Sequence, residues 1–234
     1  EIYRCDWSSD VCSSDLDVAP DPLPPTGSPA IGAHLPPGPT PGRCAATLLA
    51  RTRAALRPDE DLWVFGYASL IWRPEFEAAE ERTARAHGWH RALAMVWRLN
   101  RGTPECPGLV CAMLPGGCVT GMVYRVPAAR AHDELTRLWE REMPNAVYDP
   151  RWLPCRTAHG PVRALAFTLS RRSPHWTGRL DDQRLLSVLR QARGRFGTTL
   201  EYLLQTERGL RERGIVDGEF ARMAALARRH GLAG

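Results

Sequence analysis

The order of strand-like and helix-like segments is the feature that most restricts the fold of this chain. Stretches rich in β-branched and aromatic residues, separated by Gly and Pro, predict strands at 62–67, 84–99 with a break at Gly88, 109–114, 120–126 and 161–169. An amphipathic helix is predicted over 128–143, between the fourth and fifth strands. From residue 179 the pattern is helical to the end. This order predicts an α+β fold, with strands around one helix and a helical C-terminal segment.

Helix-capping signals divide the C-terminal segment into three helices. The first covers 181–193. The second opens with Thr198 and Glu201, which have the spacing of a capping box. The third, 217–231, begins at Asp217, a favourable N-cap residue, and stops at a glycine.

The first 42 residues differ in composition from the rest of the chain. Residues 17–42 hold nine of the 20 prolines, which predicts an extended, disordered linker, with a PxxP ligand for another protein as the alternative. Residues 1–16 have neither helical nor strand periodicity and resemble translated sequencing adapter, so we expect them to be non-native. Residues 44–56 have helical spacing and are expected to dock on the folded part. We therefore predict one domain over 43–234, with its core at about 62–228.

The amount and distribution of positive charge indicate which kinds of partner the chain can bind. All 31 basic residues are arginine, which is typical of a GC-rich coding sequence, and the net charge is +5. The arginines occur singly or in pairs, whereas a nucleic-acid surface requires a basic cluster. We expect no nucleic-acid partner, and a small anionic substrate fits the modest positive charge.

Cysteine usage and hydropathy indicate a cytoplasmic protein. None of the seven cysteines forms a CxxC pair or has zinc-site spacing with histidine. The odd number, without a signal peptide, favours free thiols in a reducing cytoplasm. No apolar run reaches the roughly 18 residues of a membrane span, so we expect no membrane association. The sequence does not indicate an oligomeric state.

One carboxylate interrupts the apolar stripe of the predicted helix 128–143. Glu142 follows Leu138 and Trp139 by four and three residues, which places it on their side of the helix. Removal from water would raise the pKa of this carboxyl and suit it to general-base catalysis near neutral pH. The alternative is that the helix frays before residue 142, because Pro144 follows closely. The stripe comprises Ala128, Ala131, Leu135, Leu138 and Trp139, and the expected solvated face carries Asp133, Arg137, Glu140 and Arg141.

Several segments match the pattern of one family. These are WVFGYASLIW (63–72), RGTPECPGLV (101–110), GGCVTGMVYRV (116–126), the Arg-Glu pair in WEREM (139–143), YLLQT (202–206) and GIVD (214–217). In this order, from about Leu62 to Ala227, they resemble the ChaC-type gamma-glutamylcyclotransferases. The resemblance implies a small mixed β-barrel flanked by helices. It also implies glutathione as substrate, cleaved without a cofactor or metal into 5-oxoproline and cysteinylglycine.

The same resemblance implies roles for individual residues. Glu142 matches the catalytic base of the family, and the loop after the first strand matches its substrate-binding loop. Arg98 and Arg101 are candidates for the substrate carboxylates, with ordinary surface arginines as the alternative, and Tyr202 is either a pocket or a core residue. The loop residues expected to bind substrate are Gly66, Tyr67, Ala68, Ser69, Leu70 and Ile71.

Ser69 is expected to contribute a hydrogen bond and not to act as a nucleophile, because no GxSxG motif surrounds it. Two departures from the family pattern are Ala68, in place of the usual glycine, and Cys106 within the RGTP segment. If position 68 requires a positive φ, alanine there costs about 1 kcal/mol. Two other functions stay open: cyclisation of other γ-glutamyl amides, and a catalytically silent binding domain of the same fold.

Overall fold

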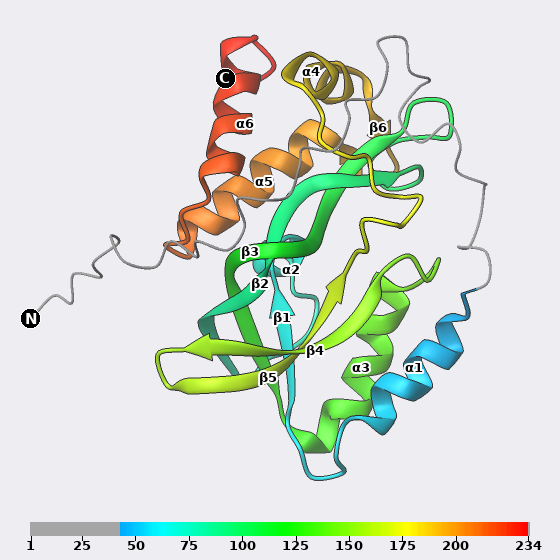
Figure 1. Ribbon diagram of the computed structural model, residues 1–234, viewed down its shortest axis with the longest axis vertical. Coiled ribbons are helices and arrows are strands. Elements are labelled where there is room, and N and C mark those ends of the chain that lie inside the picture. The colour runs from blue at the N-terminus through cyan, green and yellow to red at the C-terminus, as the bar shows by residue number, and fades with distance from the viewer. Residues whose placement is uncertain (1–42, 234) are drawn as a thin grey trace, which may run out of the picture.

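The computed structural model describes residues 43–233, which form a closed β-barrel with helices around it (Figure 1). The strand order around the barrel is β1, β3, β2, β4, β5. All neighbouring strands are antiparallel except β1 and β5, which are parallel, so the predicted mixed barrel is confirmed. The expectations for residues 1–16 and 17–42 lie outside the described residues, and the single domain over 43–234 stays a prediction. The strands are β1 (Leu62–Gly66), β2 (Glu80–Trp97), β3 (Gly108–Val126), β4 (Asp149–Thr157) and β5 (Gly160–Thr168).

The strand β1 is the best-buried strand and leads directly to the candidate site. Leu62, Val64 and Phe65 are almost fully buried, as expected for a strand between two neighbours. Along one edge, β1 pairs with β3 over its whole length. Along the other, it pairs with β5 only at Trp63 and Val64.

The strand β3 is one element of 19 residues, whereas the sequence predicted two strands separated by a turn. Gly116 and Gly117 have positive φ values of 99° and 75°, which normally indicates a turn. Here the opposite strand shifts its register between His87 and Trp89, where Gly88 also has a positive φ. Both strands therefore bend together and stay paired.

The strand β4 was missed because it contains Pro150 and Pro154, and proline removes a ladder hydrogen bond. Both prolines pair in register with β5. On its other side β4 pairs with β2 only from Cys155 to Thr157. The prolines therefore lie where one flank of β4 has no partner strand, which is where a strand tolerates a residue without an N–H.

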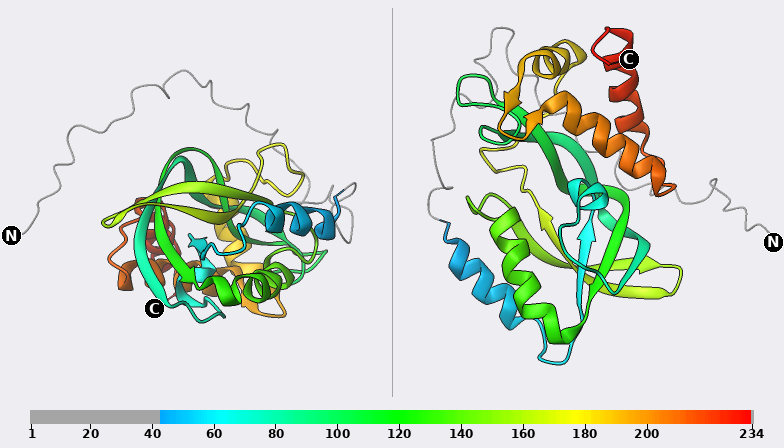
Figure 2. Two further views of the ribbon diagram at one scale, coloured as in Figure 1. Left: turned by 90° about the horizontal axis from the view of Figure 1, so that it is seen from below. Right: turned by 180° about the vertical axis from the view of Figure 1, so that it is seen from behind.

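Two groups of helices flank the barrel, α1 with α3 and α4 with α5 and α6, and the short helix α2 lies between β1 and α5 (Figures 1 and 2). Two of them, α1 and α3, pack against each other, so the docking expected for 44–56 is confirmed. The C-terminal group packs on β3. None of the helices within 43–233 has the length and apolar character needed to cross a bilayer. The helices are α1 (Ala45–Ala54), α2 (Ser69–Trp72), α3 (Ala128–Glu142), α4 (Asp182–Gln191), α5 (Thr199–Glu212) and α6 (Gly218–Arg229), and the hairpin β6 (Arg193–Gly194) and β7 (Gly197–Thr198) precedes α5.

The capping signals of the last two helices are confirmed. Thr198 accepts a hydrogen bond from the Glu201 amide, and the Glu201 carboxylate accepts one from the Thr198 amide, which makes a complete capping box. Asp217 accepts a bond from the Phe220 amide and caps α6. These caps fix where α5 and α6 begin.

The helix α5 holds the short helix α2 against the barrel. Gly209 leaves room for Trp72, because a Cβ at position 209 would lie 3.0 Å from the Trp72 Cβ. The Trp72 indole also donates to the Thr206 hydroxyl at 3.3 Å. The segment after β1 is therefore fixed from both sides, by the barrel and by α5.

Candidate active site

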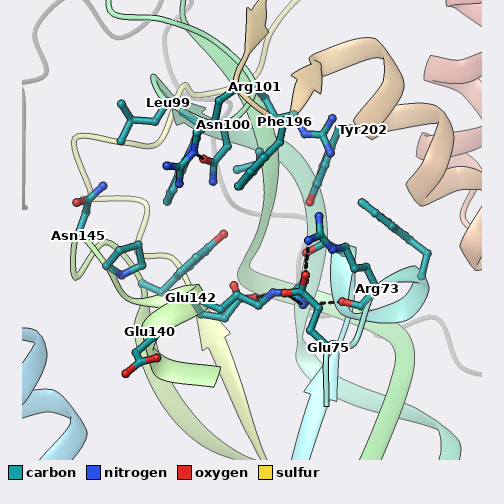
Figure 3. A pocket seen from close by; sticks show the side chains of 18 residues that line it. Arg73, Glu75, Leu99, Asn100, Arg101, Glu140, Glu142, Asn145, Phe196 and Tyr202 are labelled. Atoms are coloured by element: carbon teal, nitrogen blue, oxygen red, sulfur yellow. Dashed lines mark hydrogen bonds and ion pairs between the residues drawn. The ribbon is translucent and has the colours of Figure 1, made fainter. Parts of the chain in front are cut away.

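A cavity of about 390 Å³ lies between the C-terminal end of α3, the helix α2 and the β6–β7 hairpin. Figure 3 shows Arg101, Phe196 and Tyr202 on one side of this outer cavity, with Glu142 and Glu75 on the facing side. A smaller inner cavity of about 20 Å³ continues toward the barrel. Both are lined by Ser69, Glu142, Tyr148 and Tyr202.

Glu142 lies at the junction of the two cavities. The helix α3 continues through this residue, and Met143 is its C-cap, so the alternative of an earlier frayed end is wrong. Its side chain is 15% exposed, and one carboxylate oxygen lies 3.0 Å from Arg141 Nε. Burial raises the pKa of the Glu142 carboxyl, the Arg141 guanidinium lowers it, and the nearby charge of Glu75 raises it. The carboxylate that interrupts the apolar stripe is thus directed into a cavity and not into water.

Arg141 belongs to the cavity wall, and its predicted place on the solvated face is wrong. Its guanidinium donates to the carbonyl of Arg73 at 2.6 Å and to the carboxylate of Glu75 at 2.8 Å. It also donates to the Ser69 hydroxyl at 3.3 Å. Since these partners follow β1, Arg141 connects the end of α3 to α2. Helical periodicity missed this role because the segment that covers Arg141 comes from elsewhere in the chain.

The loop after β1 divides into lining and supporting residues. Tyr67, Ala68, Ser69 and Leu70 line the inner cavity. Gly66 and Ile71 do not line either cavity. A Cβ at Gly66 would lie 2.9 Å from the Tyr124 ring, so glycine here permits close packing.

Ala68 has a φ of −143°, so position 68 does not require the left-handed conformation that favours glycine. Alanine in place of the usual glycine therefore carries no penalty from a positive φ. Ser69 and Leu70 open α2, and amides at the first positions of a helix have no partner within it.

Three tyrosine side chains surround the inner cavity. The Tyr67 hydroxyl donates to the carbonyl of Phe167 at 2.8 Å, and the Tyr148 hydroxyl donates to the carbonyl of Cys111 at 3.4 Å. The Tyr202 hydroxyl accepts from the Cys111 amide at 3.2 Å. Burial raises the pKa of all three well above the usual value, so these groups stay protonated near neutral pH. Tyr148 lies after α3 in a stretch without a sequence pattern, and no signal could have found it.

The structure places the two candidate arginines in different surroundings. Arg101 is 7% exposed, lines the outer cavity, and lies 5.3 Å above the Tyr202 ring. Burial lowers the pKa of its guanidinium. Arg98 does not line either cavity, and its charge acts on the exposed Glu105. The structure therefore brings Arg101, but not Arg98, together with Glu142 and Tyr202.

Two further arginines of the outer cavity come from surface loops and have no sequence signal. Arg73 and Arg195 both lie over the Phe196 ring, at 6.0 and 4.6 Å from its centroid. Arg73 is also ion-paired with Glu75, so Arg101 and Arg195 are the better placed of the three for an anionic ligand in the outer cavity. Within 43–233, no group of His, Cys, Asp or Glu side chains is arranged to hold a metal ion.

Comparison with known proteins identifies the family. Residues 62–229 match the family model described as ChaC-like protein. Over 174 residues the chain is 38% identical to the glutathione-specific gamma-glutamylcyclotransferase of Escherichia coli (strain K12), covering 74% of this chain and 75% of that protein. It is 31% identical over 149 residues to the human glutathione-specific gamma-glutamylcyclotransferase 1, covering 62% and 67%.

A solved structure agrees with the fold. The crystal structure of a gamma-glutamyl cyclotransferase specific to glutathione from yeast superposes with a TM-score of 0.64 at 18% identity. The superposition covers 73% of this chain and 99% of the yeast chain. The motifs recognised in the sequence, the barrel and the family match all agree, and the chain belongs to the ChaC-like family.

Proposed function

We propose that the chain cleaves glutathione by cyclising its γ-glutamyl group to 5-oxoproline, with release of cysteinylglycine and with Glu142 as general acid and base. The related proteins in Escherichia coli and human are named for activity on glutathione. The observation that supports the mechanism most directly is the position of Glu142. Its carboxylate lies between a narrow inner cavity and a wide outer one, and burial raises its pKa.

The reaction begins with attack of the substrate α-amine on its own γ-carbonyl carbon. The amine and the carbonyl belong to one molecule, so the site has only to fold the substrate into the attack geometry. Such proximity contributes about 7–11 kcal/mol. We assign the γ-carbonyl oxygen to the inner cavity, whose volume of about 20 Å³ suits a group the size of a water molecule, and the rest of the γ-glutamyl group to the adjoining part of the outer cavity beside Glu142.

Proton transfer in two directions completes the reaction. The α-ammonium group that prevails near neutral pH must lose one proton before it attacks and a second as the lactam N–H forms, and the leaving nitrogen of cysteinylglycine takes up two and departs as an ammonium. A carboxyl with a raised pKa performs both transfers in turn, and general acid–base catalysis of this kind contributes about 10²- to 10⁴-fold. Glu142 is the only carboxylate that lines the inner cavity within the described residues.

Negative charge develops on the γ-oxygen as the ring closes. We assign its stabilisation to amides of Ala68, Ser69 and Leu70, which come from a segment that lines the inner cavity. Ser69 is not assigned as nucleophile. Its hydroxyl accepts a bond from Arg141, and no histidine lines either cavity within the described residues.

We assign the leaving dipeptide to the outer cavity, where Arg101 and Arg195 can neutralise its carboxylate. We place this activity in the cytoplasm, where cysteine thiols stay reduced. The thiols at Cys111 and Cys155 are free and buried, which is consistent with such a compartment. No cofactor is required by any step of the reaction.

The decisive experiment measures 5-oxoproline release from a panel of γ-glutamyl compounds. Glutathione should give 5-oxoproline and cysteinylglycine in equal amounts, at a higher kcat/KM than γ-glutamyl amino acids. A higher value for a γ-glutamyl amino acid would favour the broader cyclotransferase. Release from none of the compounds, with glutathione still bound, would establish the silent binding domain. Glu142→Gln should lower release by about 10²- to 10⁴-fold, whereas Asp133→Asn, on an exposed residue of the same helix that lines neither cavity, should not lower it.

A further inference from the structure

A buried arginine of β2, Arg91, lies behind the inner cavity and has no part in the steps above. Its side chain is 1% exposed. Each of its three guanidinium nitrogens donates a hydrogen bond. Nε donates to the Tyr67 carbonyl, one terminal nitrogen to the Asp217 carboxylate, and the other to the Thr120 carbonyl at 2.6 Å. The planar fork is therefore held in one orientation.

Asp217 belongs to the GIVD stretch, and its carboxylate has two partners. One oxygen accepts from the Phe220 amide at 3.0 Å and caps α6. The other accepts from Arg91. The Arg91 guanidinium also lies 5.9 Å above the Phe220 ring. The start of the last helix is thereby connected to the peptide bond that follows Tyr67, on the wall of the inner cavity.

The bond from Arg91 fixes the plane of the peptide between Tyr67 and Ala68. In a trans peptide the carbonyl and the following N–H point in opposite directions, and the described chain has no cis peptide bond. Since the Tyr67 carbonyl points to Arg91, the Ala68 N–H points away from it. Ala68 lines the inner cavity and Arg91 does not, so this amide is directed to the cavity side.

The charge of Arg91 also acts inside the cavity. Burial raises the pKa of Tyr67 and Cys111, and the Arg91 guanidinium lowers the pKa of both. Both residues line the inner cavity. A positive charge close behind the wall favours negative charge that develops in front of it.

We propose that Arg91 is a positioning residue for the cyclisation, which holds the Tyr67–Ala68 peptide so that the Ala68 N–H faces the oxyanion, with Asp217 fixing the guanidinium. This inference rests on the proposed function. It gives the GIVD stretch a role in catalysis although Asp217 lines neither the inner nor the outer cavity.

Two variants and one control test the inference on the full chain. Arg91→Lys keeps the charge but loses the fork that holds Tyr67, Thr120 and Asp217 together. Asp217→Asn keeps a good N-cap residue but loses the carboxylate that fixes Arg91. The control is Arg222→Met on α6, because Arg222 pairs with exposed carboxylates of Asp182 and Glu219 and does not touch the loop after β1.

The readouts separate positioning from a loss of folded protein. Turnover of glutathione gives kcat and KM for each variant. Calorimetric titration with glutathione, in a Glu142→Gln background that prevents turnover, counts the competent sites and gives Kd. A purely structural role for Arg91 would lower the number of sites, whereas positioning of the oxyanion donor leaves the number and Kd unchanged.

We expect Arg91→Lys to lower kcat by about 10- to 100-fold, with KM and Kd within about threefold of wild type. Asp217→Asn should lower kcat by about three- to tenfold. The kcat of the control, Arg222→Met, should stay within about twofold of wild type. If Arg91→Lys does not fold, Asp217→Asn decides. If a variant binds glutathione at every site and its kcat is within twofold of wild type, the role of Arg91 is refuted and the proposed function is not. A wild-type chain that makes no 5-oxoproline overturns the proposed function and the inference with it.

Discussion

Replacing Glu142 with glutamine should lower activity and raise stability at the same time. Glutamine keeps the shape of the side chain but cannot exchange protons. General acid–base catalysis is worth about 10²- to 10⁴-fold in kcat, or about 2.7–5.5 kcal/mol. Arg141 keeps its bonds to Glu75 and to the Arg73 carbonyl, so the substitution does not leave a buried guanidinium without a partner.

The stability gain follows from the direction of the pKa shift. Burial raises the folded-state pKa of Glu142 above its ordinary value of 4.5, so ionisation disfavours the folded chain. The Glu142 contribution to wild-type stability is fully present below pH 4.5 and is lost as pH rises through the folded-state pKa. Glutamine does not titrate, so the Tm advantage of Glu142→Gln should be absent below pH 4.5, grow above it and then level off.

The assay is a set of thermal unfolding curves from pH 4 to 8 with parallel kcat measurements. In a domain of this size, each kcal/mol of stabilisation raises Tm by about 2–4 °C. Asp133→Asn, on an exposed residue of the same helix that lines neither cavity, is the matched control and should change neither quantity. A Glu142→Gln chain with kcat within tenfold of wild type would refute the general base. A lower Tm than wild type at pH 8 would refute the argument that the carboxylate is destabilised by burial.

Three further predictions concern the surroundings of this carboxylate and the caps. Arg141→Met removes the guanidinium that lowers the pKa of Glu142, so the acidic limb of the pH profile of kcat/KM should move to higher pH, and an unchanged limb would contradict the ion pair. Thr198→Ala removes the capping box and should lower stability by about 1 kcal/mol, seen as a Tm lower by about 2–4 °C. Ala68→Gly should leave kcat/KM within about twofold, because φ at this position is negative; a tenfold gain would show strain in the loop.

Much of the fold could be predicted because local patterns and tertiary packing agree. The strand β1 follows its apolar run and the helix α3 its apolar periodicity, and Thr198 and Asp217 begin helices where their side chains can cap them. The prediction failed where the pairing of a distant strand decides the conformation. Pro150 is tolerated in β4 only because one flank of that part of the strand has no partner, which a linear sequence does not reveal.

The same distinction applies to the candidate site. Glu142 could be found because a carboxylate on an apolar stripe conflicts with the helical pattern. Arg141 was misplaced, and Tyr148 was missed, because their positions depend on segments that fold over them from elsewhere in the chain. Arg98 and Arg101 looked equivalent, since arginine is abundant throughout this sequence and only the structure separates them.

The short parallel seam between β1 and β5 has a consequence for how the chain reaches its native state. Only Trp63 and Val64 join Ala164 and Leu165 there, across about 100 residues of sequence, and contacts of such long range form late in folding. During synthesis β1 must wait until β5 has left the ribosome, and until then its edge is open to pairing with other chains. Because β1 continues directly into the loop that lines the inner cavity, we expect activity to appear only after β1 and β5 have paired.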